Sequence, residues 1–219
     1  KEIHLAGLSR IHVGLESGSD EVLKFIKKGV TARQHVEAGR KVKESGISLS
    51  EYVILGMGGK RWTKEHALET ANVLNQINPN FIRLRTLSMR KGIAMIEKVE
   101  TGEFELLHED DVVREEMSLI SNLDGITSYL KSDHALNLLQ EVEGRLPEDK
   151  ERMLAITNRY LLLSAEDRLN FRLGKRSNIY LYLSDMEDTE KYEYVQKAIA
   201  EVGDNDPDKI IEHLKSQCL

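Results

Sequence analysis

The first stretch whose residue types could do chemistry is 10–20, which reads RIHVGLESGSD. Residues alternate between the two faces of a strand, so the apolar residues share one face while His12 and Glu16 share the other. An imidazole and a carboxylate on one face can bind a ligand or move a proton. The turn at 17–19, rich in glycine and serine, lets the backbone approach such a ligand closely.

Two later apolar runs, 47–55 and 81–87, carry polar residues in the same alternating way. If helices cover the apolar faces, the opposite side displays Tyr52 from one run and Arg83 and Arg85 from the other. Polar groups are costly in a dry core unless they are paired. We therefore expect a solvated cavity or a bound ligand on this face. Internal pairing of Glu16 with the arginines is the alternative, and the two can coexist.

Helical patterns separate these runs. A helix should follow residue 19, a second should begin at Thr31 with Gln34 completing a capping box, and a third should begin at Thr63 and end before Pro79. Strands that alternate with helices form parallel βαβ units, which makes residues 1–90 a parallel α/β region. Ligands of such sheets bind at the carboxyl ends of the strands.

The rest of the chain is mostly helical. We expect a connecting region at 91–134 with a helix from Glu109 and a strand within 126–132, and a helical region at 135–219. Asp133 should cap a helix that ends at Gly144. Alternatively, Asp133 and His134 end a strand and reach the cavity.

Composition bounds the class of protein. A net charge of −6 over 219 residues does not favour nucleic acid as a partner, and no apolar run approaches the roughly 20 residues of a membrane helix. The single cysteine, Cys218, excludes a disulfide framework and favours a cytoplasmic location.

Two weaker features occur later in the chain. The acids after His108 favour a helix N-terminus over a metal site. A basic cluster is either an RNA contact or a solvated helix end. The cluster comprises Arg168, Arg172, Lys175 and Arg176.

The stretch GLESGSDEVL at 14–23 resembles the fourth-strand region of radical S-adenosylmethionine (radical SAM) iron-sulfur oxidoreductases. Weaker resemblances follow in YVILGMGG at 52–59, in INPNFIRLRTL at 77–87, and in 132–150. The likeness spans about residues 1–185. It implies a partial parallel (β/α) half barrel of the TIM type, which binds S-adenosylmethionine against a [4Fe-4S] cluster, followed by a mostly α-helical C-terminal region.

The resemblance also implies site residues. Those expected to bind the cofactor are Glu16, Ser17, Ile54, Gly56, Leu84 and Arg85. Those expected to face an unknown substrate are His12, Tyr52, Arg83 and His134. Tyr52 and Gly59 depart from the family pattern, which has a glycine and an acid there. We assign no catalytic residue and expect no metal ligand.

The family binds its cluster through three closely spaced cysteines, which this chain lacks. We expect a fragment of a longer enzyme that holds neither cluster nor cofactor by itself; loss of the chemistry is the alternative. Competing hypotheses are a noncatalytic module that binds protein or RNA, and an iron-free barrel enzyme that uses Glu16 and His12. A truncated barrel leaves the strand at 11–15 with an open edge, which we expect a homodimer or the chain's own helices to cover.

Overall fold

A mixed sheet forms the centre of the structure, a computed structural model that describes residues 2–89, 95–202 and 206–217. Within these residues its strand order is β1-β2-β3-β4-β5. The first four strands run parallel, and β5 is antiparallel to β4. The strands are β1 (Arg10–Glu16), β2 (Ser48–Leu55), β3 (Phe81–Thr86), β4 (Tyr129–Lys131) and β5 (Gly144–Arg145). This arrangement confirms the predicted α/β half barrel.

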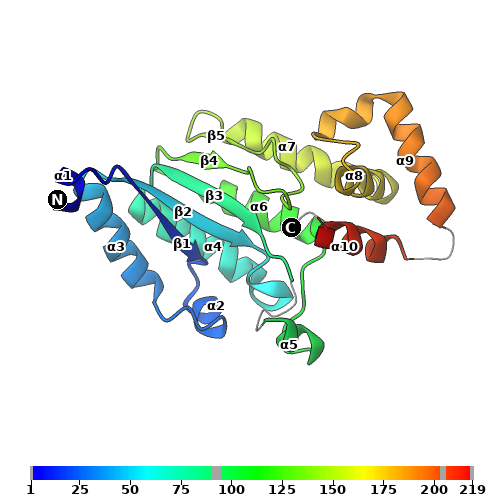
Figure 1. The fold of residues 1–219 in the computed structure, drawn as a ribbon. Coiled ribbons are helices and arrows are strands. Elements are labelled where there is room, and N and C mark those ends of the chain that lie inside the picture. The colour runs from blue at the N-terminus through cyan, green and yellow to red at the C-terminus, as the bar shows by residue number, and fades with distance from the viewer. Residues whose placement is uncertain (1, 90–94, 203–205, 218–219) are drawn as a thin grey trace.

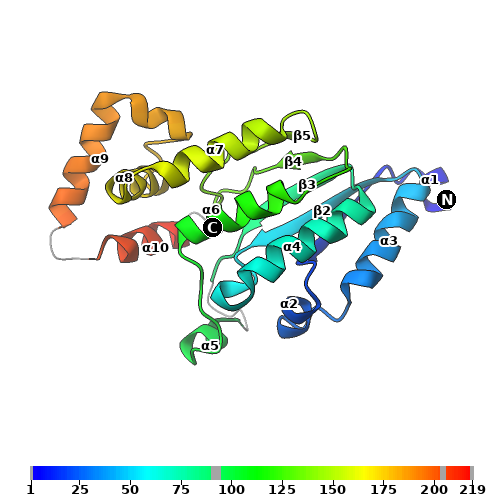
Figure 2. The same cartoon turned by 180° about the vertical axis from the view of Figure 1, so that it is seen from behind.

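Helices cover one face of the sheet and leave the other open (Figures 1 and 2). The covered face carries the fully buried Leu49, Val53 and Leu84. The covering helices are α3 (Ala32–Glu44), α4 (Gly59–Ile77) and α6 (Glu109–Ser121), with short helices α1 (Glu2–Leu5) and α2 (Asp20–Phe25) beside them. The predicted capping box of Thr31 and Gln34 begins α3. The sheet therefore has an apolar side and a separate, accessible side.

The C-terminal region is helical, as predicted. It comprises α7 (Lys150–Leu162), α8 (Ala165–Arg176), the 3-10 turn η1 (Leu183–Glu187), α9 (Thr189–Val202) and α10 (Pro207–Gln217). The arrowheads of β1, β2 and β3 point toward the side of the molecule that carries α2, α5 (Met95–Glu100) and α10 (Figure 1). The C-terminal helix thus returns to the carboxyl ends of the strands.

Two expectations about helix starts were wrong. No helix follows Asp133; residues 135–143 form turns, although Leu136, Leu139 and Val142 are buried. Side chains hold these turns, because Ser132 and Asn137 donate to the carbonyls of Leu139 and Leu84. Helix α4 begins at Gly59 and kinks at Trp62, so Thr63 does not cap it.

None of the described helices is long and apolar enough to cross a membrane. The division at residues 90 and 134 stays a prediction; across it, Leu130 of β4 pairs with Gly144 of β5. Cys218 lies outside the described residues.

Candidate functional site

A row of stacked polar and aromatic side chains crosses the open face of the sheet. Register places Gly14 beside Tyr52 and Tyr52 beside Arg83, so these positions share a face, as predicted. The ring of Tyr52 lies 5.7 Å from that of His12, and the guanidinium of Arg85 lies 4.9 Å from the Tyr52 ring centroid. Planar groups from three strands therefore form one continuous surface, which suits contact with a flat, polar ligand.

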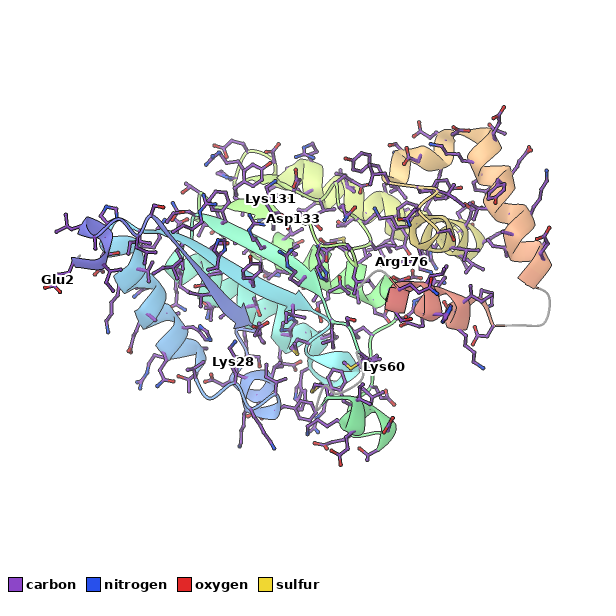
Figure 3. The ribbon with its side chains drawn as sticks, in the orientation of Figure 1. Glu2, Lys28, Lys60, Lys131, Asp133 and Arg176 are labelled. Atoms are coloured by element: carbon purple, nitrogen blue, oxygen red, sulfur yellow. The ribbon has the colours of Figure 1, made fainter. Side chains whose placement is uncertain are left out.

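The two arginines of this face both bind Asp133. Arg83 Nη1 donates to Oδ2 at 2.6 Å, and Arg85 Nη1 donates to Oδ1 at 2.8 Å. Burial alone would raise the pKa of the Asp133 carboxyl, but the Arg85 hydrogen bond and the two positive charges outweigh it and lower the pKa. Asp133 thus reaches the open face at the end of β4 (Figure 3). Internal pairing of the arginines does occur, with this carboxylate as the partner.

Glu16 lies at an irregularity in β1. The register shifts between Gly14 and Glu16, whose φ is +63°. This twist brings the Glu16 carboxylate over Gly14, where any Cβ on Gly14 would meet it at 2.3 Å. Lys28 Nζ then lies 3.1 Å from Glu16 Oε1. A non-glycine residue in the left-handed region is strained, and such strain is often found at ligand sites. Glu16 is therefore held on the open face, paired with Lys28 and not with the arginines.

Ser17 lies beneath the surface, in a hydrogen-bonded network that the sequence did not reveal. Its hydroxyl lies 2.8 Å from His66 Nδ1, and His66 Nε2 lies 3.1 Å from the Ile54 carbonyl. Glu115 of α6 accepts from the Gly56 N–H at 2.6 Å and from the Thr63 hydroxyl at 2.7 Å. The loops that follow β1 and β2 are thus joined through two buried side chains of α4 and α6.

Close backbone contacts explain the glycines of the loop after β2. Gly56 has a φ of +82° and Gly59 one of +55°, values that L side chains adopt only with strain. A Cβ on Gly59 would lie 2.7 Å from the Glu105 carbonyl oxygen. There is no room for the acid that the family pattern has at this position. The carboxylate that reaches this loop comes from Glu115.

A cavity of about 90 Å³ lies where β2 and β3 end. Leu55, Gly56 and Thr86 line it at the strand ends, and Lys215 and Ser216 of α10 lie opposite. Benzene fits an apolar cavity of about 150 Å³. A nucleobase would therefore enter this space only if the segments that line it moved apart, whereas the open face beside Ile54 has no such limit.

The remaining predicted residues are placed as follows. The Leu84 side chain is fully buried on the helix-covered face, and its carbonyl accepts from Asn137 at 3.1 Å. His134 is half-buried, with Nδ1 3.4 Å from the Thr86 nitrogen. The structure therefore brings His12, Tyr52, Arg83 and Arg85 together, while Ser17 and Leu84 lie behind them.

The basic cluster is neither an RNA contact nor a solvated helix end, so both predictions for it were wrong. Arg172, Lys175 and Arg176 are only 6%, 7% and 3% exposed. Arg172 donates to Asp208 at 2.6 Å, and both Nε and Nη2 of Arg176 donate to Glu109. These cations hold the C-terminal helices together and offer no surface to RNA.

The chain has one cysteine, whereas a [4Fe-4S] cluster of the resembled kind needs three, so its residues do not fit that group. Among the described residues, no group of three or more His, Cys, Asp or Glu side chains lies close enough to hold a metal ion.

Comparisons with known proteins match a part of the chain. The sequence model of the Radical SAM superfamily matches residues 1–74. A "probable threonylcarbamoyladenosine tRNA methylthiotransferase" of Methanocaldococcus jannaschii is 30% identical over 131 residues, which are 55% of this chain and 29% of that protein. A "tRNA-2-methylthio-N(6)-dimethylallyladenosine synthase" of Fusobacterium nucleatum is 26% identical over 145 residues, which are 64% of this chain and 32% of that protein.

A solved structure has a similar fold. The Elp3 protein of Methanocaldococcus infernus, with an N-terminal deletion, aligns with a TM-score of 0.50 at 21% sequence identity. The alignment covers 60% of this chain and 32% of that one. Each of these matches therefore spans less than a third of the other protein. The family match is thus to residues 1–74, which hold β1, β2 and most of α4, and the parallel sheet agrees with it.

Proposed function

We propose that this chain contributes part of the S-adenosylmethionine site, and part of the adjoining substrate pocket, to a radical SAM enzyme. The observation that supports this most is the joined pair of strand-end loops beside the polar row on the open face. In this proposal Ile54 and the Gly56 backbone contact the nucleoside, and Glu16 binds a polar group of the cofactor. Arg83 and Arg85 exchange Asp133 for an anionic group, since guanidinium binds carboxylates and phosphates with two parallel hydrogen bonds.

The cluster cysteines would come from a segment outside this sequence, since Cys218 alone cannot hold the group. The residues of this chain would orient the nucleoside and hold the substrate. The ion pair of Glu16 and Lys28 then places one negative and one positive group on the open face, beside the row of planar groups.

Relatives whose names specify tRNA weigh against our expectation that nucleic acid is not a partner. The open face supports a nucleoside-bearing substrate in one respect. Three cation–π pairs lie on it: Arg10 over Phe81, Arg85 over Tyr52, and Lys131 over Tyr129. Aromatic rings and arginine planes stack on unpaired bases. We therefore include an RNA nucleoside among the substrates to be tested.

Isothermal titration of the intact gene product with S-adenosylmethionine tests the cofactor half of the proposal. Wild type should bind, and Ile54→Ala should weaken binding about tenfold if a contact worth roughly 1.5 kcal/mol is lost. Leu162→Ala removes an equally apolar side chain that is 76% exposed and far along the sequence, and it serves as the matched control. Absence of binding by wild type, or equal effects of the two variants, would refute this half.

Reconstitution with iron and sulfide tests the enzyme half. The product of the intact gene should then show iron-sulfur absorbance and release 5′-deoxyadenosine. An intact gene product that lacks three clustered cysteines and does neither would favour the noncatalytic alternative.

A further inference from the structure

We infer that Glu115 and His66 are positioning residues for the cofactor site, which fix the loops after β1 and β2 in the shape that binds a nucleoside. This inference rests on the function proposed above and adds the residues that act from behind the site. Neither side chain reaches the open face: the Glu115 side chain is 0% exposed and that of His66 is 2% exposed. They would act on a ligand only through the loops that they hold.

Glu115 holds the start of the loop after β2. Its Oε1 accepts from the Gly56 N–H and its Oε2 accepts from the Thr63 hydroxyl, so both oxygens are used. Gly56 is one of the residues expected to approach the nucleoside, and because glycine can adopt many backbone conformations, its surroundings decide which one it keeps. A carboxylate that accepts a backbone N–H makes a strong, charge-assisted hydrogen bond. Glu115 thus fixes where the Gly56 amide lies.

His66 links that loop to the loop after β1. Its Nε2 lies 3.1 Å from the Ile54 carbonyl, which can only accept, so Nε2 carries the hydrogen and Nδ1 accepts from the Ser17 hydroxyl. The Ser17 oxygen in turn accepts from the Ser19 N–H at 3.0 Å. His66 Nε2 also lies 3.6 Å from Glu115 Oε1, which closes the network. His66 therefore joins the loop after β1 to the end of β2, and through Glu115 to the Gly56 amide.

The electrostatics make this network sensitive to pH near neutrality. Burial raises the pKa of Glu115 to about 7, against the hydrogen bonds from Gly56 and Thr63, which lower it. Burial lowers the pKa of His66 to about 4, against the bond to Ile54, so His66 stays neutral. Among the described residues, His66 is the only basic side chain with a nitrogen within 4 Å of the Glu115 oxygens, and no charged group contributes to the shift of the Glu115 pKa.

Protonation of Glu115 changes what the loop can bind to. The Gly56 N–H and the Thr63 hydroxyl both donate to the ionised carboxylate of Glu115. When Glu115 is protonated, it has one acceptor fewer for these two donors. Thr63 can accept the new proton only if its hydroxyl rotates and gives up its own donation. Because only ionised Glu115 holds the loop in the shape that binds, the apparent affinity for the nucleoside is proportional to the fraction of Glu115 that is ionised. With a pKa of about 7, affinity should fall about tenfold between pH 8 and pH 6.

The test is titration of the intact gene product with 5′-methylthioadenosine at pH 6, 7 and 8. This uncharged nucleoside has no group that titrates in that range, so the profile reports on the protein. We expect the tenfold fall in wild type and a flat profile in Glu115→Gln, which keeps an acceptor for Gly56 but cannot ionise. Glu116→Gln is the matched control, because Glu116 is a buried acid at the next position, and its Oε1 has no hydrogen-bond partner among the described residues. It should keep the wild-type profile.

The outcomes separate this inference from the proposed function. No binding by wild type at any pH overturns both. Binding with the same pH dependence in wild type and Glu115→Gln overturns the inference and leaves the function standing. If Glu115→Gln does not fold, the Gly56 amide of wild type is followed by NMR across the same pH range. A shift with a midpoint near 7 supports the inference, and a constant signal refutes it.

Discussion

Replacing Arg176 by methionine should cost this protein far more stability than a helix-end arginine normally carries. Arg176 of α8 is 3% exposed and donates to the Glu109 carboxylate and to the Leu136 carbonyl, the latter at 2.9 Å (Figure 3). The change leaves Glu109 buried without its cation, and its Oε2 already lacks a hydrogen-bond partner. Breaking a buried pair from one side costs about 3–5 kcal/mol. We expect the lower end, because Glu109 lies in the first turn of α6, where the helix dipole favours a carboxylate.

Urea unfolding followed by far-UV circular dichroism measures this cost. The midpoint should fall while the slope stays constant, which identifies a change in stability and not in the unfolded state. Arg33→Met is the matched control: its side chain is 86% exposed, and its loss should stay within about 0.5 kcal/mol. The double variant Arg176→Met with Glu109→Gln should recover more than half of the loss, since no buried charge then remains.

An exposed basic cluster predicts a different result. Arg176→Met would then unfold like Arg33→Met and would change only the binding of anions. A loss below about 1 kcal/mol would therefore refute the buried ion pair.

Further predictions concern other parts of the chain. Burial and the Glu141 charge raise the pKa of Glu116 to about 8, above its value of 4.5 in the unfolded chain, so Glu116 lowers the stability of the fold as pH rises from 4.5 through 8. Glu116→Gln should therefore raise stability at pH 9 by at most about 5 kcal/mol and change it little at pH 5. A gain in thermal stability that does not depend on pH would contradict this. Gly18→Ala should lower stability by about 2 kcal/mol, because its Cβ would lie 2.4 Å from the Glu69 carbonyl oxygen, and an unchanged melting temperature would mean that the loop can shift. Asp133→Asn should remove the negative charge that pairs with Arg83 and Arg85 and leave both guanidinium groups open to another anion. Inorganic phosphate should therefore raise the melting temperature of this variant more than that of wild type. Sedimentation velocity should find a homodimer formed through β1, the outer strand of the sheet, and a monomer would argue against it.

Local patterns were enough to predict the three long parallel strands and their two faces, but not β5, where Gly144 was expected to end a helix. Alternation in 10–16, 47–55 and 81–87 depends only on neighbouring residues, and each run contains a strand whose expected face is the more buried one. The capping box at Thr31 is local in the same sense, since both of its hydrogen bonds join residues three apart. Such features survive folding unless a distant contact opposes them.

Distant contacts explain the failures. Leu136, Leu139 and Val142 have spacings that suit a helix, but Asn137 donates to a carbonyl of β3, 53 positions away, and the segment folds into turns. Thr63 has the chemistry of a helix cap, yet its hydroxyl donates to Glu115, 52 positions away. Arg172 and Arg176 look like a solvated helix end because their carboxylate partners come from α10 and α6. Periodicity contains no information about these partners.

One signal in the sequence does point to the buried network behind the candidate site. In α6 the apolar stripe runs through Val112, Val113 and Ile120, and Glu116 falls within it, with Glu115 at its margin. In α4, His66 falls on the stripe that continues through Thr70 and Leu74. A charged or titratable residue on a stripe that faces the core must be paired or neutral once buried. Such a residue therefore predicts a hydrogen-bonded network, and because these helices cover β2 and the loop after it, the network lies directly behind the face that meets the ligand.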